Sequence, residues 1–170
     1  PEVVQACELL SRDLREALEV AVSARTRLIA VTNPNNPVGT ILTGPEMDAV
    51  VAAARRSDAW LLADEVYRGT ERLTDDLTPT FWGRHERTIS VGSLSKAFGL
   101  PGLRLGWIVA PPEIVEAAWR RHEYATIATG MLSMRLGELA LEPVTRDRLL
   151  ARTRRYIRNG RDLAQWVHVD

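Results

Sequence analysis

Cysteine is almost absent from this sequence of 170 residues, in which Cys7 is the only one. A single thiol cannot form a disulfide within the chain, and it lacks the companion ligands that a metal site requires. Proteins without disulfides are typical of reducing compartments. We therefore expect a cytoplasmic protein that contains no metal centre.

Long apolar runs and an excess of one charge are absent as well. No stretch approaches the roughly 20 apolar residues of a membrane-spanning helix, and the first residues lack the basic and apolar blocks of a signal peptide. Lys and Arg together equal Asp and Glu together, at 22 each, so no net field attracts the chain to nucleic acid or to an anionic membrane. We expect neither as a partner.

Lysine is the scarcest charged residue, because 21 of the 22 basic residues are Arg and the only Lys is Lys96. A codon bias toward Arg would leave one lysine by chance. However, only a primary amine condenses with an aldehyde, and the guanidinium of Arg cannot replace it. The one retained lysine is therefore a candidate nucleophile.

Seven arginines lie between Arg146 and Arg161, with Asp147 as the only acid among them. Such a run could bind phosphate or nucleic acid, but aromatic residues do not alternate with these arginines as a base-stacking surface requires. We interpret them as the solvated face of a helix.

Short β-branched and aliphatic runs predict buried strands at 28–32, 60–63 and 88–91. The run 105–110 follows the third strand too closely for a helical crossover of a dozen residues or more, so we expect it to be antiparallel. With 45% hydrophobic and 26% charged residues, the chain has the composition of one globular domain. The pattern predicts an α/β domain around a mainly parallel sheet with one antiparallel strand.

Helical spacing of apolar residues alternates with these strands. The clearest helix begins at Thr43, which forms a capping box with Glu46 and has Pro45 in the first turn. The apolar face of this helix is formed by Met47, Val50, Val51 and Ala54. Further helices are predicted at 14–22, 112–122, 132–141 and 145–166.

Three polar clusters follow strands, at the ends where the ligands of parallel sheets gather. They are Asn-Pro-Asn-Asn-Pro-Val-Gly at 33–39, Asp-Glu-Val-Tyr at 64–67 and Ser-Leu-Ser-Lys at 93–96. Taken singly, each is an ordinary turn, cap or loop. Their order along the chain, followed by Gly-Leu-Pro-Gly-Leu-Arg-Leu-Gly-Trp at 99–107, makes them informative.

From about Thr26 to Ala110, these strings resemble the class I/II aminotransferases of fold type I, which bind pyridoxal phosphate (PLP). The resemblance implies part of a three-layer sandwich around a mainly parallel sheet with one antiparallel strand. Residues 1–142 would belong to the PLP-binding large domain, and 143–170 would form a helix leading toward a small C-terminal domain that is missing here. Because the sequence begins with Pro rather than Met, we expect the natural N-terminus to lie upstream.

The resemblance assigns the chemical requirements of PLP to residues of this sequence. Lys96 matches the catalytic lysine that holds the cofactor aldehyde as a Schiff base and then acts as base and acid in turn. Asp64 matches the aspartate that pairs with the protonated ring nitrogen.

Four further residues match cofactor-binding positions of the family. Tyr67 and Asn36 correspond to donors to the phenolic oxygen of the ring, which stabilise its anion and lower the pKa of the Schiff base. Asn36 would also contact the substrate carboxylate. Ser93 and Arg104 correspond to phosphate ligands, a role that suits the planar donor fork of Arg. Ser95 stays open as a further phosphate contact.

The sequence also departs from the family pattern. Val38 stands where many relatives carry Thr, and the upstream phosphate loop, the ring-stacking aromatic residue and the C-terminal arginine for the substrate carboxylate have no counterpart in the chain. Glu65 should point away from Asp64 and have no role in the site. We expect His85 and His122 at the surface, because the three histidines have no metal-ligand spacing.

The resemblance implies a PLP-dependent transaminase that transfers an amino group between an amino acid and a 2-oxo acid, as a homodimer in the full-length protein. Another reaction of fold type I enzymes remains open, as a lyase, synthase or amino-acid oxidase. A non-catalytic aminotransferase-like sensor domain of a transcription regulator is a further alternative, and an inactive gene remnant is the last. Formation of pyridoxamine without release of ammonia would favour transfer, and an upstream winged-helix domain would favour the regulator.

Overall fold

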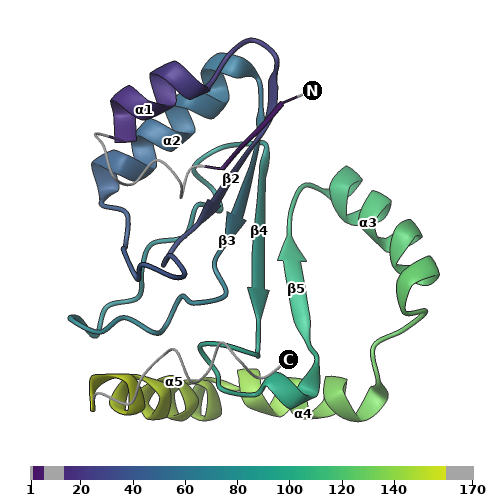
Figure 1. The fold of residues 1–170 in the computed structure, drawn as a ribbon. Coiled ribbons are helices and arrows are strands. Elements are labelled where there is room, and N and C mark those ends of the chain that lie inside the picture. The colour runs from purple at the N-terminus through teal and green to yellow at the C-terminus, as the bar shows by residue number, and fades with distance from the viewer. Residues whose placement is uncertain (1, 6–13, 160–170) are drawn as a thin grey trace. The chain divides into compact units, whose positions relative to one another are not determined.

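The strands form one five-stranded sheet in the order β1-β2-β3-β4-β5 (Figure 1). The structure is a computed structural model and describes residues 2–5 and 14–159. The pairs β1–β2, β2–β3 and β3–β4 are parallel, whereas β5 runs antiparallel to β4. The predicted α/β class, with a mainly parallel sheet and one antiparallel strand, is therefore confirmed. The strands are β1 Glu2–Gln5, β2 Thr26–Thr32, β3 Trp60–Asp64, β4 Thr88–Ser93 and β5 Gly106–Val109.

Strand β1 is an element that the sequence pattern did not predict. It has four residues and pairs only with β2, and the Val3 side chain is 66% exposed. Four residues are too few for a periodic sequence pattern to reveal a strand of this kind.

All predicted helices are present, with bounds shifted by a few residues. The final predicted helix, 145–166, begins earlier, at Pro143, because proline suits the first helical turn. It ends at Arg158, and the remainder of the predicted range, 160–166, lies outside the described residues. The helices are α1 Leu14–Ala21, α2 Gly44–Ser57, α3 Pro112–Ala125, α4 Met131–Leu141 and α5 Pro143–Arg158, with a 3-10 turn, η2, at Pro101–Leu103.

The chain forms two compact units that are interleaved along the sequence. The first unit comprises Pro1–Glu65, Pro79–Gly92 and Trp107–Ala128. The second comprises Val66–Thr78, Ser93–Gly106 and Thr129–Asp170. The first unit therefore contains most of the sheet, and the second contains α4 and α5.

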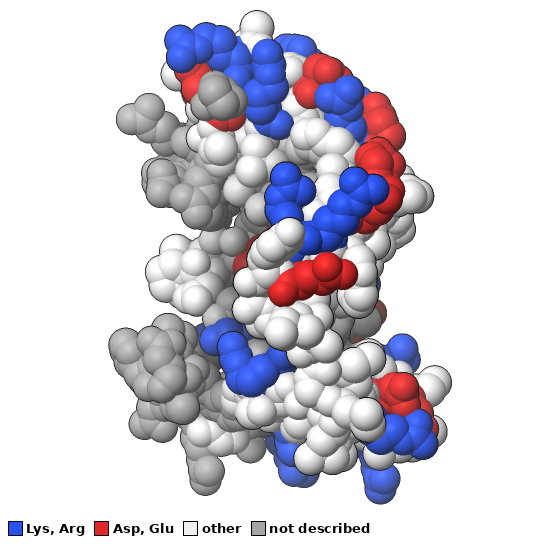
Figure 2. Space-filling view, turned by 90° about the vertical axis from the view of Figure 1, so that its right-hand side faces the viewer, with Lys and Arg blue, Asp and Glu red and all other residues white. Residues whose placement is uncertain are grey.

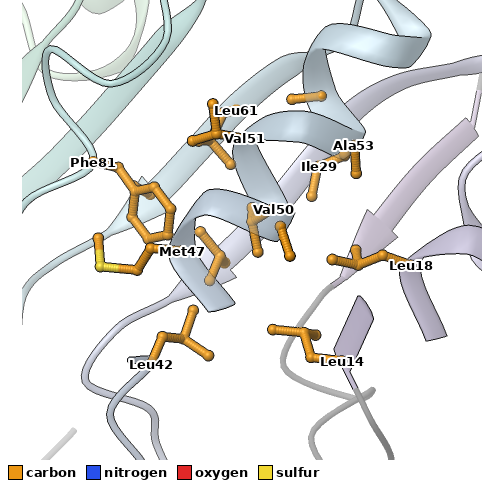
Figure 3. Close-up of a cluster of buried hydrophobic side chains, with 14 of the residues drawn as sticks. Leu14, Leu18, Ile29, Leu42, Met47, Val50, Val51, Ala53, Leu61 and Phe81 are labelled. Carbon is orange, nitrogen blue, oxygen red and sulfur yellow. The ribbon is translucent and has the colours of Figure 1, made fainter. Parts of the chain in front are cut away.

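Helices α1 and α2 cover one face of the sheet in the first unit (Figure 1). Figure 3 shows side chains of α2 between those of the sheet, such as Ile29 and Leu61, and those of α1, such as Leu14 and Leu18. All four residues of the predicted apolar face of α2 are buried, so that prediction is confirmed. Removing such side chains from water is the main source of stability for this unit.

The capping box predicted at the start of α2 is confirmed. One carboxylate oxygen of Glu46, Oε2, accepts hydrogen bonds from the Thr43 backbone N at 2.7 Å and from Thr43 Oγ1 at 2.6 Å. These bonds satisfy a backbone donor that the first turn of a helix leaves without a partner.

The second unit has a smaller apolar cluster, to which α4 contributes Ala140 and α5 contributes Leu150. Three arginines of α5, namely Arg152, Arg154 and Arg158, donate hydrogen bonds to backbone carbonyls of other segments of this unit. Arg152 and Arg158 remain exposed, but the Arg154 side chain is only 14% exposed, so the expectation of a solvated arginine face is wrong for Arg154. The cause is the fold of segment 66–78, which the local pattern of α5 does not reveal.

His85 is buried, which corrects the expectation that it lies at the surface. Its side chain is 2% exposed, and Nε2 lies 3.2 Å from the Ala59 carbonyl oxygen. A histidine without metal-ligand spacing can still be buried when it pairs with a backbone carbonyl.

Charged side chains of both signs are interspersed on the face drawn in Figure 2. This distribution agrees with equal numbers of basic and acidic residues. Among the described residues, no helix is both long enough and apolar enough to cross a membrane.

Candidate active site

Asp64 and the Asn-Pro turn at 33–39 are joined in the first unit. Asp64 is the last residue of β3 and pairs in register with Thr32, so the turn begins beside it. The Asn33 backbone N donates to the Asp64 carbonyl oxygen at 3.0 Å, and Asn33 Oδ1 accepts from the Leu42 backbone N at 3.0 Å. Asn36 lies within this anchored turn and is exposed, whereas Asp64 is half-buried.

Hydrogen bonds within the turn explain why Val38 is compatible with it. The Gly39 N donates to the Asn35 carbonyl oxygen at 2.9 Å, and the Val38 N lies 3.3 Å from Asn35 Oδ1. The Val38 side chain is 69% exposed. The bond at position 38 therefore uses the backbone N of Val38 and does not require the hydroxyl of a threonine.

Lys96 lies in a tight turn of the second unit. Leu94 and Ala97, on either side of it, are buried in the apolar cluster and anchor the turn. The Gly99 N closes the turn by donating to the Lys96 carbonyl oxygen at 3.0 Å. Ser93 Oγ accepts a bond of 3.3 Å from the Ser95 N, so both serines are part of the same local structure.

Tyr67 lies beside this turn in the same unit. Lys96 Nζ is 5.9 Å from the centroid of the Tyr67 ring. The two segments also meet through their backbones, because the Ala97 N lies 3.4 Å from the Val66 carbonyl oxygen. The primary amine and the phenol are therefore neighbours, as joint binding of one ligand requires.

Arg104 follows the 3-10 turn η2 and has a left-handed backbone conformation, with φ at 50°. For a residue other than glycine this conformation costs roughly 1 kcal/mol, and such positions are concentrated at functional sites. The Arg104 side chain is exposed and bonds the Pro101 carbonyl oxygen at 3.2 Å. Its guanidinium therefore lies at the surface of the second unit.

The six predicted site residues thus form two groups. Asn36 and Asp64 lie together in the first unit, and the second unit brings together Lys96, Tyr67 and Ser93, with Arg104 at the end of η2. The side chain of Glu65 instead accepts bonds of 2.9 Å and 2.7 Å from Thr80 Oγ1 and the Phe81 N. These bonds give Glu65 a structural role.

Sequence reasoning missed Asn33, which it treated only as part of a turn. Asn33 is 2% exposed, and its Nδ2 has no hydrogen-bond partner in the structure. Together with its bond to the Leu42 N, its contact with Asp64 makes it the residue that fixes the turn. The repeated Asn-Pro pair within 33–37 was the available signal.

A cavity in the second unit does not coincide with the predicted site, and the described residues contain no candidate metal site. A cavity of about 360 Å³ in the second unit is lined by arginines of α5, by Asp75 and by neighbouring residues of the helix, and none of the predicted site residues lines it. Within residues 2–5 and 14–159 there is no group of three or more His, Cys, Asp or Glu that could hold a metal ion.

Comparison with known families gives a match over almost the whole chain. The family model described as "Aminotransferase class I and II" matches residues 5–165. The chain belongs to this family. Its membership confirms the resemblance drawn from the four motifs, because that match includes all of them.

Individual relatives support the same conclusion. The chain is 37% identical over 141 residues to an aromatic amino acid aminotransferase of Mycolicibacterium smegmatis, a match that covers 81% of this chain and 37% of that enzyme. Two solved structures are also similar, each with a TM-score of 0.75. They are the N-succinyldiaminopimelate aminotransferase of Mycobacterium tuberculosis (30% identity, 85% of this chain and 38% of that one) and a PLP-dependent aminotransferase of Streptococcus suis (27% identity, 86% and 38%).

The matches cover only 37% to 38% of the length of these relatives. The donor set of the chain nevertheless fits PLP in kind. A primary amine, a carboxylate, a phenol, an amide, a hydroxyl and a guanidinium are the groups that an aldehyde, a pyridine nitrogen, a phenolic oxygen and a phosphate require. The contact between Lys96 and Tyr67 is the part of this set that the second unit holds by itself.

Proposed function

We propose that the protein containing this chain binds PLP through Lys96 and transfers an amino group between an amino acid and a 2-oxo acid. The observation that carries the proposal is the position of the only lysine. In a member of the aminotransferase family it lies 5.9 Å from the ring of Tyr67, in a turn anchored by buried neighbours. When bound, PLP supplies an aldehyde that forms a covalent bond with amines and a ring that accepts electrons from the substrate carbon.

Each residue of the chain then has a defined task. Lys96 supplies the amine that holds the cofactor and, once released by the substrate, moves a proton at the substrate α-carbon. Asp64 accepts a charge-assisted hydrogen bond from the ring nitrogen and keeps it protonated. Tyr67 and Asn36 donate to the phenolic oxygen, and Ser93 and Arg104 bind the phosphate.

The proposal extends to the assembly and to the division of the chain. We propose a homodimer in the full-length protein and a cytoplasmic location. Residues 1–142 would form part of the PLP-binding domain, and the helix from 143 onward would lead to a further domain. Because relatives act on substrates as different as aromatic amino acids and N-succinyldiaminopimelate, according to their names, the substrate is proposed only as an amino acid and a 2-oxo acid.

The test of the function is an absorbance spectrum of the full-length protein with PLP, followed by reduction with borohydride. We expect a visible band and a trapped adduct on the peptide that contains Lys96. The variant Lys96→Arg should lose both, because it keeps the positive charge but has no primary amine. A band and adduct that persist in Lys96→Arg would show that the site assignment is wrong.

A second measurement separates transfer from other reactions of the cofactor. With a panel of amino acids and no 2-oxo acid, we expect one equivalent of pyridoxamine phosphate per site and no ammonia. Steady release of ammonia would reject transfer and support lyase or oxidase chemistry at the same residues.

A further inference from the structure

The segment that follows Tyr67 is organised around a buried carboxylate, that of Glu71. The Glu71 side chain is 1% exposed. Its Oε1 accepts hydrogen bonds from the Gly69 N at 3.0 Å, the Thr78 N at 2.9 Å and Thr78 Oγ1 at 2.8 Å. Burial by itself raises the pKa of Glu71, but the hydrogen bonds from Thr78 and Gly69 outweigh it and lower the pKa. Glu71 is therefore a carboxylate at neutral pH.

Arg154 of α5 neutralises this carboxylate. Its side chain is 14% exposed, and its Nη2 donates to Glu71 Oε2 at 3.2 Å. Arg154 Nε also donates to the Gly69 carbonyl oxygen at 3.2 Å. One guanidinium thus holds both the backbone and the buried charge of the segment, and removing it would leave that charge without a positively charged partner.

Helix α5 also holds the turn that carries Lys96. Arg152 donates to the Phe98 carbonyl oxygen at 3.2 Å. Leu150 packs so closely on Gly69 that a Cβ added there would lie 2.7 Å from Leu150 Cδ2 and 3.4 Å from the Ala97 Cβ. The segment after Tyr67 and the turn around Lys96 are therefore attached to the same helix.

We propose that the Glu71–Arg154 ion pair is a positioning device that fixes Tyr67 relative to Lys96, an inference that rests on the function proposed for these two residues. Thr70, which precedes Glu71, connects it to Tyr67, because the Thr70 N and Oγ1 donate to the Tyr67 carbonyl oxygen at 2.9 Å and 2.7 Å. Without the ion pair, the Tyr67 hydroxyl is no longer held at a fixed place beside the cofactor. The hydroxyl then stabilises the anion of the cofactor's phenolic oxygen less. As a result, the Lys96 nitrogen that holds the cofactor loses its proton only at higher pH.

The test is a pH titration of the visible absorbance of the PLP-loaded full-length protein. In Glu71→Gln we expect the borohydride-trapped Lys96 adduct to remain and the titration midpoint to rise by roughly half to one pH unit. The variant Tyr67→Phe should raise it by at least as much. The double variant should show no further rise, because Glu71 acts through the Tyr67 hydroxyl. A midpoint that is unchanged in Glu71→Gln, or shifts that add in the double variant, would overturn the proposal.

Matched controls come from the same segment and the same helix. Asp76→Asn removes an exposed carboxylate of segment 66–78, and Arg148→Met removes an exposed arginine of α5. Neither should move the midpoint. If Glu71→Gln does not fold, Arg154→Lys replaces it, since it keeps the charge but loses the fork that holds Gly69 and Glu71 together. The midpoint should still rise in this variant, and an unchanged value would overturn the proposal.

A measurement without the cofactor separates this inference from the proposed function. Hydrogen exchange of the amides of residues 66–71 should become faster in Glu71→Gln than in Asp76→Asn, because the ion pair attaches the segment to α5. If wild-type protein forms no Lys96 adduct while this exchange still increases, the proposed function fails and the positioning role stands. Equal exchange in both variants would reject the positioning role itself.

Discussion

The two compact units differ in whether an ion pair is buried within them. The cluster shared by α1, α2 and the sheet in the first unit consists entirely of apolar side chains. In the second unit the apolar cluster is smaller, and the Glu71–Arg154 pair joins residues 83 positions apart in the chain. Apolar burial has no direction, whereas a carboxylate with four partners fixes the backbone around it. The second unit, which carries Lys96, thus has a buried ion pair beside its apolar cluster, whereas each ion pair within the described part of the first unit has at least one exposed side chain.

The largest expected effect lies in the apolar unit. Phe81 is fully buried beside Met47 (Figure 3), and Phe81→Ala should lower the free energy of unfolding by about 3–5 kcal/mol. Urea unfolding measures this change, and it should be similar at pH 5 and pH 7 because no charge is involved. Val20→Ala, at a side chain that is 85% exposed, is the control and should cost less than about 0.5 kcal/mol. Similar losses in both variants would contradict the packing seen in Figure 3.

Acidification should weaken the contribution of the Glu71–Arg154 ion pair in the second unit, whereas the apolar cluster of the first unit contains no group that titrates. The pKa of Glu71 in the folded protein lies below its ordinary value of 4.5, because hydrogen bonds from Thr78 and Gly69 outweigh the effect of burial. The carboxylate therefore adds stability above about pH 4.5, and this contribution is lost as the pH falls through the lowered pKa.

The measurement is the free energy of unfolding in urea between pH 7 and pH 3. At pH 7 the free energy of unfolding of Glu71→Gln should be lower than that of wild type. Below pH 4.5 the variant should lose less of it, so that the two curves of unfolding free energy against pH converge. Asp76→Asn, an exposed carboxylate of the same segment, should follow the wild-type curve. If the Glu71→Gln curve stays parallel to that of wild type, Glu71 does not contribute in this way.

The smallest effect concerns a polar interaction at the edge of the apolar unit. Thr43→Ala removes one of the two hydrogen bonds that Thr43 donates to Glu46, and it should cost about 1 kcal/mol. Thermal unfolding measures the loss, and hydrogen exchange should increase mainly in the first turn of α2. A loss comparable to that of Phe81→Ala would mean that the first unit depends on directional bonds as well as on apolar burial.

Local patterns predicted most of the elements. The helix that begins at the Thr43 capping box and the strand that ends at Asp64 were both recognisable, because capping and buried strands depend on residues close in sequence. The antiparallel direction of β5 followed from the length of its connection to β4. The edge strand β1 was not predicted, since four residues are too few for a periodic pattern to be recognised.

The candidate site was recognised through four motifs, and the family match confirms that they belong to one kind of protein. The roles of Lys96, Asp64 and the other four residues remain predictions. The residues that support them were not recognised. Asn33, which fixes the turn beside Asp64, was treated only as a turn residue.

The sequence by itself determined the α/β class, the order of the elements and the presence of one lysine after a strand, because these depend on spacing along the chain. Only the tertiary structure decided that Glu71 is buried and that Arg154 is its partner. Burial and ion pairing between residues so far apart depend on which segments the fold brings into contact, and no local pattern contains that information.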